Sequence, residues 1–370
     1  MREVLRRTTA ILAVSATWVV AAAPQVEWTR TFAGEGTSEG HCVQQTSDGG
    51  FIVAGVTDSH PGYPHFYLVK TDSLGNTEWT RAFGHTGEGG AYSVQQTADG
   101  GYVVVGSRVL AAWRLAVWLA KIASSGDIEW QKPVSDSAAR LDFGFSVVQS
   151  GDDGFVVAAV ADLSEDSGLA LIKTDSLGNG MWTRRYPVPY PDYGPWNPVQ
   201  LQQTSDGGFI VGARALLKVD SLGNQQWLRT YTGLRNAYSV LQTSDGGYVA
   251  TGPAPDSGGG HGAIGLLKTN SKGKQQWLRT YAEGKYSRGG YSVVQIDDGG
   301  YAIAGAKYDS SYVVRTDPTG AVVWSEALRV GGEAYGIQQT NDGGFVIIEN
   351  RWDDAVHSDA LHLLKLAPEQ

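Results

Sequence analysis

The chain has 370 residues, a length that by itself would favour more than one domain. It contains 49 glycines and 12 tryptophans but only 18% charged residues, a composition typical of all-β proteins with many tight turns. The formal net charge of −9 argues against nucleic acid and anionic lipid as partners, because both would repel the protein.

The N-terminus has the pattern of a secretory signal peptide. Three arginines precede an apolar run over residues 10–20, which is too short to cross a bilayer comfortably. Small residues follow, and Pro24 favours cleavage after Ala22. We therefore predict a signal peptide over 1–22 and a secreted protein, extracellular or periplasmic, over 23–370. An uncleaved membrane anchor is the alternative, and we expect no membrane span after cleavage.

Seven copies of one repeat of about fifty residues fill the remaining chain. Five types of residue recur in register, each filling one column of the repeat. The tryptophan column is Trp28, Trp79, Trp130, Trp182, Trp227, Trp277 and Trp324. The glutamine column is Gln45, Gln96, Gln149, Gln203, Gln242, Gln295 and Gln339. An aspartate follows each glutamine by three residues and an aromatic residue by six, and the basic column is Lys70, Lys121, Lys173, Lys218, Lys268, Arg315 and Lys365.

Each repeat is predicted to form four strands, called A to D. In the first repeat, residues 66–71 form strand C, and residues 78–83 form strand D with the tryptophan. In the second, residues 91–97 form strand A and residues 102–106 form strand B. The Asp-Gly-Gly turn between them, centred on Gly100, is typical of a tight hairpin with positive backbone angles.

A four-stranded sheet cannot bury both of its faces alone, and a ring of sheets solves this because each blade covers the next. We expect the tryptophans to lie between blades, with the indole N–H reaching a neighbouring carbonyl. The glutamine column is predicted to face the same interface and to tie backbone groups together, and the basic column to be packed and ion-paired. A binding role for the glutamines is the alternative.

The two ends of the chain complement each other. Residues 25–32 form a strand D with no strands before it, whereas the last repeat has strands A to C over 335–340, 345–348 and 360–366 but no strand D. Pairing these ends removes the open edges. The sequence therefore predicts an all-β, seven-bladed β-propeller of four-stranded antiparallel blades, closed by the N-terminal strand and monomeric. The single cysteine, Cys42, cannot form an internal disulfide.

Segments such as 94–102 and 173–179 resemble a propeller repeat of exported bacterial and archaeal surface proteins. The segment from Asp72 to Trp79 is similar to the tryptophan-docking motif of quinoprotein-type propellers, with one residue fewer in the turn. The resemblance covers residues 25–370. It implies the propeller fold, and it implies no catalytic residues, because the repeated residues are scaffold.

Any binding site is expected on the face formed by the D–A and B–C loops, because these vary in length while the other turns are uniform. Aromatic side chains rimmed by charges suit sugars or extended peptides. The candidate binding residues are Tyr63, His65, Arg108, Trp113, Tyr190, Tyr193, Trp196, Tyr308 and Trp352.

Catalysis is less favoured by the sequence. No nucleophile elbow, zinc-binding helix or phosphate loop is present, so we predict no catalytic residue, no metal and no cofactor. We expect a non-catalytic module that binds a glycan, a peptide or a surface partner. The alternative is a carbohydrate-active hydrolase or lyase with two carboxylates at the channel mouth. The acidic residues on the loop face that could supply them are Asp58, Asp142, Glu165, Asp166, Asp192 and Asp354.

A third interpretation, a quinone-dependent oxidoreductase, is supported only by the likeness to the tryptophan-docking motif.

Overall fold

The structure is a computed structural model. It describes residues 22–33, 36–58, 65–84, 89–110, 114–134, 141–161, 168–188, 198–256, 262–284, 289–308, 310–355 and 357–369. The predicted signal peptide therefore lies almost wholly outside the described residues. None of the described residues forms a helix long and apolar enough to cross a membrane.

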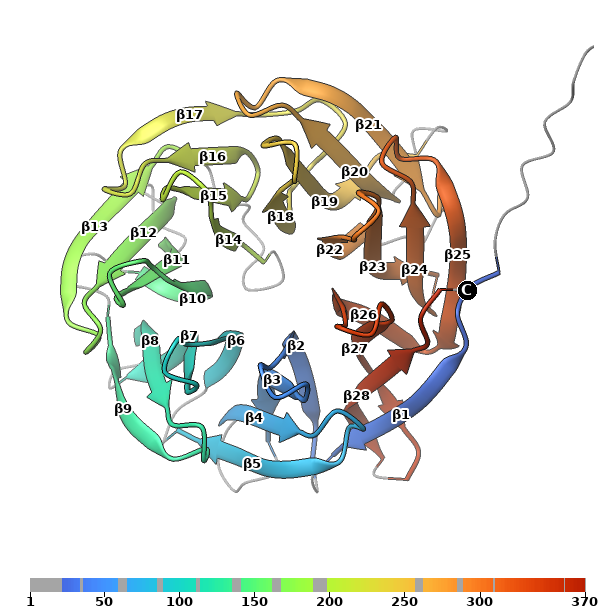
Figure 1. The fold of residues 1–370 in the computed structure, drawn as a ribbon. Coiled ribbons are helices and arrows are strands. Elements are labelled where there is room, and N and C mark those ends of the chain that lie inside the picture. Colours follow the sequence, from blue (N-terminus) through green and yellow to red (C-terminus); the bar gives the residue numbers. More distant parts are fainter. Residues whose placement is uncertain are drawn as a thin grey trace, which may run out of the picture.

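The described residues form 28 strands in seven four-stranded antiparallel sheets, arranged as the blades of a ring (Figure 1). Strand A of each blade lies next to the axis and strand D lies outermost. Blades are numbered in chain order, so blade 1 contains β2–β5 and blade 7 contains β26–β28 with β1. The predicted seven-bladed propeller is confirmed.

The strands of each class have the following bounds. Strands A are β2 (Ser38–Gln45), β6 (Gly89–Gln96), β10 (Leu141–Gln149), β14 (Gln200–Gln203), β18 (Ser239–Gln242), β22 (Gly289–Gln295) and β26 (Gly332–Gln339). Strands B are β3 (Phe51–Thr57), β7 (Tyr102–Leu110), β11 (Phe155–Ala161), β15 (Phe209–Gly212), β19 (Tyr248–Ala254), β23 (Tyr301–Lys307) and β27 (Phe345–Asp353). Strands C are β4 (His65–Thr71), β8 (Arg114–Ile122), β12 (Leu169–Thr174), β16 (Leu216–Val219), β20 (Ala263–Thr269), β24 (Ser310–Thr316) and β28 (Ser358–Leu366). Strands D are β5 (Thr77–Phe83), β9 (Ile128–Pro133), β13 (Gly180–Tyr186), β17 (Gln225–Arg229), β21 (Gln275–Tyr281), β25 (Val322–Val330) and β1 (Val26–Phe32).

The tryptophan column packs between blades, as predicted. The Trp79 ring of blade 1 meets Tyr102 of blade 2 edge-on at 5.8 Å between centroids, and its N–H donates to the Ser124 carbonyl at 3.1 Å. Such aromatic pairs add to the energy of burial. Equivalent pairs, with centroids 5.6–6.1 Å apart, are Trp28–Phe51, Trp130–Phe155, Trp227–Tyr248, Trp277–Tyr301 and Trp324–Phe345.

The basic column is packed and ion-paired, also as predicted. Lys218 is buried, and its ammonium lies 2.9 Å from a carboxylate oxygen of Asp206 in the A–B turn of the same blade. The other pairs are Lys70–Asp48, Lys121–Asp99, Lys173–Asp152, Lys268–Asp245, Arg315–Asp298 and Lys365–Asp342. Each pair joins strand C to the hairpin between strands A and B.

The glutamine column ties each blade to the preceding one. The Gln96 side-chain oxygen accepts from the Ser47 N–H at 2.8 Å, and that of Gln149 accepts from the Ala98 N–H at 2.9 Å. Gln45, Gln242, Gln295 and Gln339 make equivalent bonds. The structural interpretation of this column is therefore confirmed for these six glutamines.

The ring closes through the predicted exchange of strands. Strand β1 pairs with β28 in antiparallel register, with Arg30 opposite Leu363 and Phe32 opposite Leu361. In Figure 1 the blue β1 lies along the outside of the red C-terminal blade. The edge of β28 is thereby paired, and the last blade has four strands like the others.

Candidate functional site

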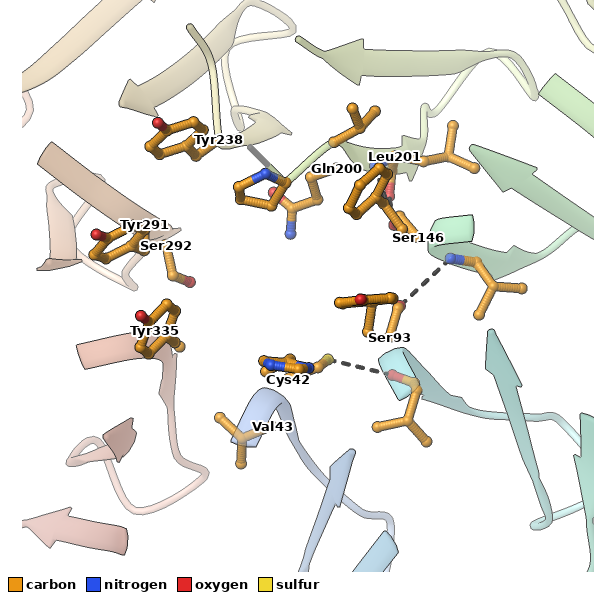
Figure 2. Close-up of a pocket in the computed structure, with 18 of the residues that line it drawn as sticks. Cys42, Val43, Ser93, Ser146, Gln200, Leu201, Tyr238, Tyr291, Ser292 and Tyr335 are labelled. Carbon is orange, nitrogen blue, oxygen red and sulfur yellow. Dashed lines mark hydrogen bonds between the residues drawn. The ribbon is translucent and has the colours of Figure 1, made fainter. Parts of the chain in front are cut away.

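A cavity of about 1010 Å³ lies on the ring axis. Its wall is formed mainly by the strand A segments of the blades, including β2, β6, β10, β22 and β26. Figure 2 shows Tyr238, Tyr291 and Tyr335 along one wall, with Ser93 and Ser146 across the opening. Small-molecule sites are concave spaces of this size with apolar and aromatic walls and a few polar groups.

Aromatic side chains reach the axis because of β-bulges. In blade 2, Ala91 pairs with Gly106 and Ser93 pairs with Val105, so Tyr92 between them has no partner on β7. An extra residue bends the strand and re-aims side chains. Simple alternation would place Tyr92 on the face that carries the valine and glutamine columns. Among the described strands, the residues in equivalent bulges are His41, Tyr92, Phe145, Tyr291 and Tyr335.

Blades 4 and 5 differ from this pattern. Tyr238 of blade 5 directly precedes the short strand β18, and its N–H donates to the Thr251 carbonyl at 2.9 Å. Blade 4 has Val199 at the equivalent position. Both residues line the cavity, so the aromatic wall is interrupted at blade 4.

Glycines on strand B make room for the bulges. A Cβ atom at Gly106 would lie 1.8 Å from the Gly90 carbonyl oxygen, and one at Gly55 would lie 1.9 Å from that of Glu39. No real Cβ tolerates such a distance from backbone. A bulge on strand A is therefore accompanied by a glycine on strand B in blades 1, 2 and 6, whereas Ala159 and Glu349 hold the equivalent place in blades 3 and 7.

One wall of the cavity consists of three stacked tyrosines and a carboxylate. Tyr238 and Tyr291 stack at 5.7 Å between centroids, and Tyr291 and Tyr335 stack at 4.8 Å. The hydroxyls of Tyr291 and Tyr335 both donate to Oε2 of Glu333, each at 2.9 Å. Two donors on one oxygen fix the orientation of the carboxylate.

A second aromatic group lies on blades 1 to 3. His41 stacks on Tyr92 at 5.1 Å, and Tyr92 contacts Phe145 at 5.4 Å. Nδ1 of His41 lies 2.9 Å from the Ala91 carbonyl and therefore donates to it. Nε2 of the same ring lies 3.8 Å from Glu39 Oε2. This group thus also combines aromatic faces with one carboxylate.

Burial and the nearby carboxylates together raise the pKa values of two tyrosines in the cavity wall. Burial, followed by the charge of Glu39, raises the pKa of Tyr92 to about 12. Burial and then Glu333 raise the pKa of Tyr291 well above its usual value. Both phenols therefore stay protonated at neutral pH, and the hydroxyl of Tyr291 donates to Glu333.

Below the aromatic residues, polar side chains join neighbouring strands around the axis. Ser146 Oγ accepts from the Leu201 N–H at 3.1 Å, and Gln44 Oε1 accepts from the Gln96 N–H at 2.7 Å. Cys42 occupies the place of Ser93 in blade 1, and its thiol points to the Val94 carbonyl at 3.7 Å. Burial raises the pKa of this thiol. These contacts join the strands A of adjacent blades around the cavity.

Four of the nine sequence-predicted binding residues lie among the described residues, and these four are on different blades. His65 begins β4, Arg108 lies over the Trp118 ring at 4.6 Å, and Tyr308 is 52% exposed. Trp352 is 53% exposed and donates to Asp354. These four lie on blades 1, 2, 6 and 7, and none lines the axial cavity. Tyr63, Trp113, Tyr190, Tyr193 and Trp196 lie outside the described residues.

The aromatic wall was not among the candidates taken from the sequence. Its residues form a further column, four positions before each glutamine, with six of seven places held by Tyr, Phe or His. Simple alternation would place this column at the blade interface, with the valine and glutamine columns. Glycine on the paired strand B, at Gly55, Gly106 and Gly305, was a signal for the bulge in blades 1, 2 and 6. The bulges at Phe145 and Tyr335 lie opposite Ala159 and Glu349 and had no such signal.

Comparison with known proteins identifies the fold. No family model matches the chain. No curated protein matches it either. A structure of streptogramin B lyase is similar, with a TM-score of 0.64 and 10% identity over 92% of this chain and 97% of that one.

Two further solved structures have the same architecture. YCF48 bound to D1 peptide matches with a TM-score of 0.59 and 10% identity, over 94% of this chain and 98% of that one. The Pan2 WD40 domain of Neurospora crassa matches with a TM-score of 0.59 and 8% identity, over 90% of each chain. At such identities the likeness shows a shared propeller fold and no shared function.

Proposed function

We propose that this protein is an exported, non-catalytic binding module that holds part of a glycan or peptide in its axial channel. The observation that carries the proposal is the aromatic wall built by bulges around an open cavity of about 1010 Å³. The bulged aromatic residues lie near the middle of their strands A, and Tyr238 directly precedes β18, at the end that joins the D–A loop. Access to the wall is expected from this variable-loop face.

Several features support binding through this wall. Tyrosine supplies large contact area with little conformational freedom to lose, and its hydroxyl gives direction. The stacked rings are held in place by Glu333 and by each other, so the site is preorganised. The structure of YCF48 with a bound peptide supports the peptide alternative, since a propeller of this architecture holds one.

The test compares two tyrosines on the same face. Protein comprising residues 23–370 is applied to a glycan array and a peptide array as wild type, Tyr291→Leu and Tyr308→Leu. Tyr291 lines the cavity, whereas Tyr308 is exposed outside it. We expect Tyr291→Leu to abolish the binding seen for the wild type and Tyr308→Leu to retain it. Two controls test for misfolding. Tyr291→Phe keeps the aromatic ring, and the melting temperature of every variant is compared with that of the wild type.

Two results would overturn the proposal. One is an absence of any ligand on both arrays. The other is full binding by a folded Tyr291→Leu variant, which would place the interaction elsewhere on the surface.

A carbohydrate-active enzyme is a second candidate because two carboxylates, Glu39 and Glu333, line the cavity. They belong to the neighbouring blades 1 and 7. A glycosidase needs two carboxyl groups roughly 5–10 Å apart on either side of the bond. Release of reducing sugar from any array glycan by the wild type, and its loss in Glu333→Gln, would establish this alternative. We expect no release.

A further inference from the structure

The inner edge of each strand A carries backbone groups that no other described strand pairs. Strand A lies next to the axis, and every second residue of such an edge directs both its N–H and its C=O away from the sheet. Leu201 shows this geometry, because its N–H donates to Ser146 Oγ at 3.1 Å and its carbonyl accepts from the same hydroxyl at 3.5 Å. Side chains of the neighbouring blade therefore decide which backbone groups stay available in the channel.

Four glutamines at the A–B turn end of the channel bind such N–H groups. They are Gln44, Gln95, Gln202 and Gln338, each one position before a member of the glutamine column, and we call them the inner glutamines. The side-chain oxygen of Gln95 accepts from the Gln149 N–H at 2.6 Å. The other three make the equivalent bond to the next blade at 2.6–2.7 Å. Because an N–H donor needs the oxygen as its partner, these bonds fix the orientation of each amide.

The NH2 groups of the inner glutamines remain as donors in the channel. All four residues are half-buried and line the cavity. Among the described residues, none accepts a hydrogen bond from their Nε2 atoms. The carbonyl of Gln149 points to the same side as the N–H that Gln95 binds, so an amide donor and a backbone acceptor share one place. A hydroxyl, which accepts and donates at one oxygen, suits such a pair.

The fold by itself does not require these amides. Blades 3, 5 and 6 have Val148, Leu241 and Val294 at the equivalent position, and their sheets have the same four strands. Three of the inner glutamines lie on the consecutive blades 7, 1 and 2, whereas Leu241 and Val294 lie together on blades 5 and 6. This layer of the channel thus combines an arc of donors with aliphatic side chains. A sugar ring has the same two characters, with hydroxyls at its edge and C–H groups on its faces.

The charges of the lining favour an uncharged ligand. No lysine or arginine is among the described residues that line the cavity, and Glu39 and Glu333 lie on its wall. An anionic ligand would therefore meet neutral donors without a basic partner, in a chain of negative net charge. Neutral sugars do not meet this penalty.

We propose that the inner glutamines of blades 7, 1 and 2 bind the hydroxyl groups of an uncharged sugar in the axial channel. Gln338, Gln44 and Gln95 donate through Nε2, the inner-edge carbonyls accept from the hydroxyls, and Leu241 and Val294 contact C–H groups of the ring. The inference rests on the proposed binding function and selects a neutral glycan as its ligand.

The experiment measures binding by titration calorimetry with residues 23–370 of the chain. The uncharged probes are cellohexaose, maltohexaose and chitohexaose. Hexagalacturonate is the acidic probe, and the blocked peptide acetyl-(Gly-Ser)3-amide supplies hydroxyls and amides without a sugar ring. We expect at least one uncharged hexasaccharide to bind, with an affinity that changes little with salt, and the acidic and peptide probes to bind about tenfold more weakly or not at all.

Two substitutions of Gln95 separate its two roles. Gln95→Glu keeps an oxygen for the Gln149 N–H and removes the NH2 donor, whereas Gln95→Leu gives blade 2 the residue that blade 5 has at Leu241. Each should weaken the sugar about fivefold to tenfold, as expected for one lost hydrogen bond. Gln275→Glu is the matched control, because Gln275 is exposed on the outer strand β21, and it should bind like the wild type.

Binding of none of the uncharged hexasaccharides would overturn the inference, and so would unchanged affinity in both folded Gln95 variants. Tighter binding of the peptide or of hexagalacturonate would overturn it as well. These results differ from failure of the proposed function. If an array ligand is lost in Tyr291→Leu but retained in both Gln95 variants, the channel binds its ligand without these amides. If Tyr291→Leu retains every interaction, both proposals fail.

Discussion

At the scale of single residues, the Lys–Asp pairs anchor each A–B hairpin to strand C. Asp99 accepts from Thr97, from the Gly101 N–H and from Lys121. The Thr97 hydroxyl outweighs partial burial and, with Lys121, lowers the pKa of this carboxyl to about 2. At Asp48, Asp152, Asp206 and Asp245 burial opposes ionisation, but the hydrogen bonds to lysine, hydroxyl and backbone lower the pKa to about 2 all the same.

These shifts predict a dependence of stability on acid. The pKa of each aspartate is lower in the folded chain than the unperturbed value of about 3.9. The unfolded chain therefore binds protons first, so the stabilisation is complete above about pH 4 and is lost as the pH falls toward 2. Thermal unfolding followed by circular dichroism should show a melting temperature that declines through this window.

Replacement of Asp245 by Asn should flatten part of that decline and lower the melting temperature at neutral pH. A wild-type melting temperature that stays constant from pH 5 to pH 2 would contradict the role of the pairs. The effect per pair is modest, because the carboxylates are about half exposed and solvent screens them.

At the scale of the element, the bulge on strand A lies opposite a glycine on strand B in blades 1, 2 and 6. Gly106→Ala places a methyl group against the Gly90 carbonyl, which must move and take the bulge with it. We expect a loss of about 2 kcal/mol in the free energy of unfolding, as for other overpacked sites. Because Tyr92 is positioned by this bulge, ligand binding in the channel should weaken as well.

Denaturant unfolding and calorimetric binding measure the two effects. Gly151→Ala is the control: its Cβ would meet nothing within 4 Å, and Ala98 occupies the equivalent turn position in blade 2. A Gly106→Ala protein as stable as Gly151→Ala, with intact binding, would show that the bulge does not depend on this glycine.

At the scale of the whole molecule, stability depends on closure by β1. The strand buries Phe32 against blade 7, and its Trp28 ring packs on Phe51 of blade 1. It therefore contributes to the interface between blades 7 and 1 as well as to the edge of one sheet.

A chain that starts at residue 36 lacks β1 and exposes the edge of β28. The lost burial of Trp28 and Phe32 should cost about 3–6 kcal/mol of unfolding free energy. The open edge should also promote self-association. Thermal unfolding and light scattering of this chain and of the chain from residue 23 provide the comparison. An equal melting temperature and a monomeric state for both would contradict the role of closure.

The sequence by itself determined the fold and its scaffold chemistry. Columns repeated seven times fix strand order, the interblade indoles and the Lys–Asp pairs, because each repeat presents the same local pattern and the same neighbour. The single strand predicted over 25–32 could likewise be paired only with the last repeat, which lacks a strand D. These features depend on local periodicity and on the requirement to pair every edge.

The site was decided only by the tertiary structure. Whether Tyr92 faces the axis or the next blade depends on a one-residue slip in pairing, and such a slip reverses side-chain direction. Gly106 across the sheet leaves room for the slip, and this contact between two strands is non-local. The grouping of Tyr238, Tyr291 and Tyr335 around Glu333 likewise exists only once the ring brings three separate blades to one axis.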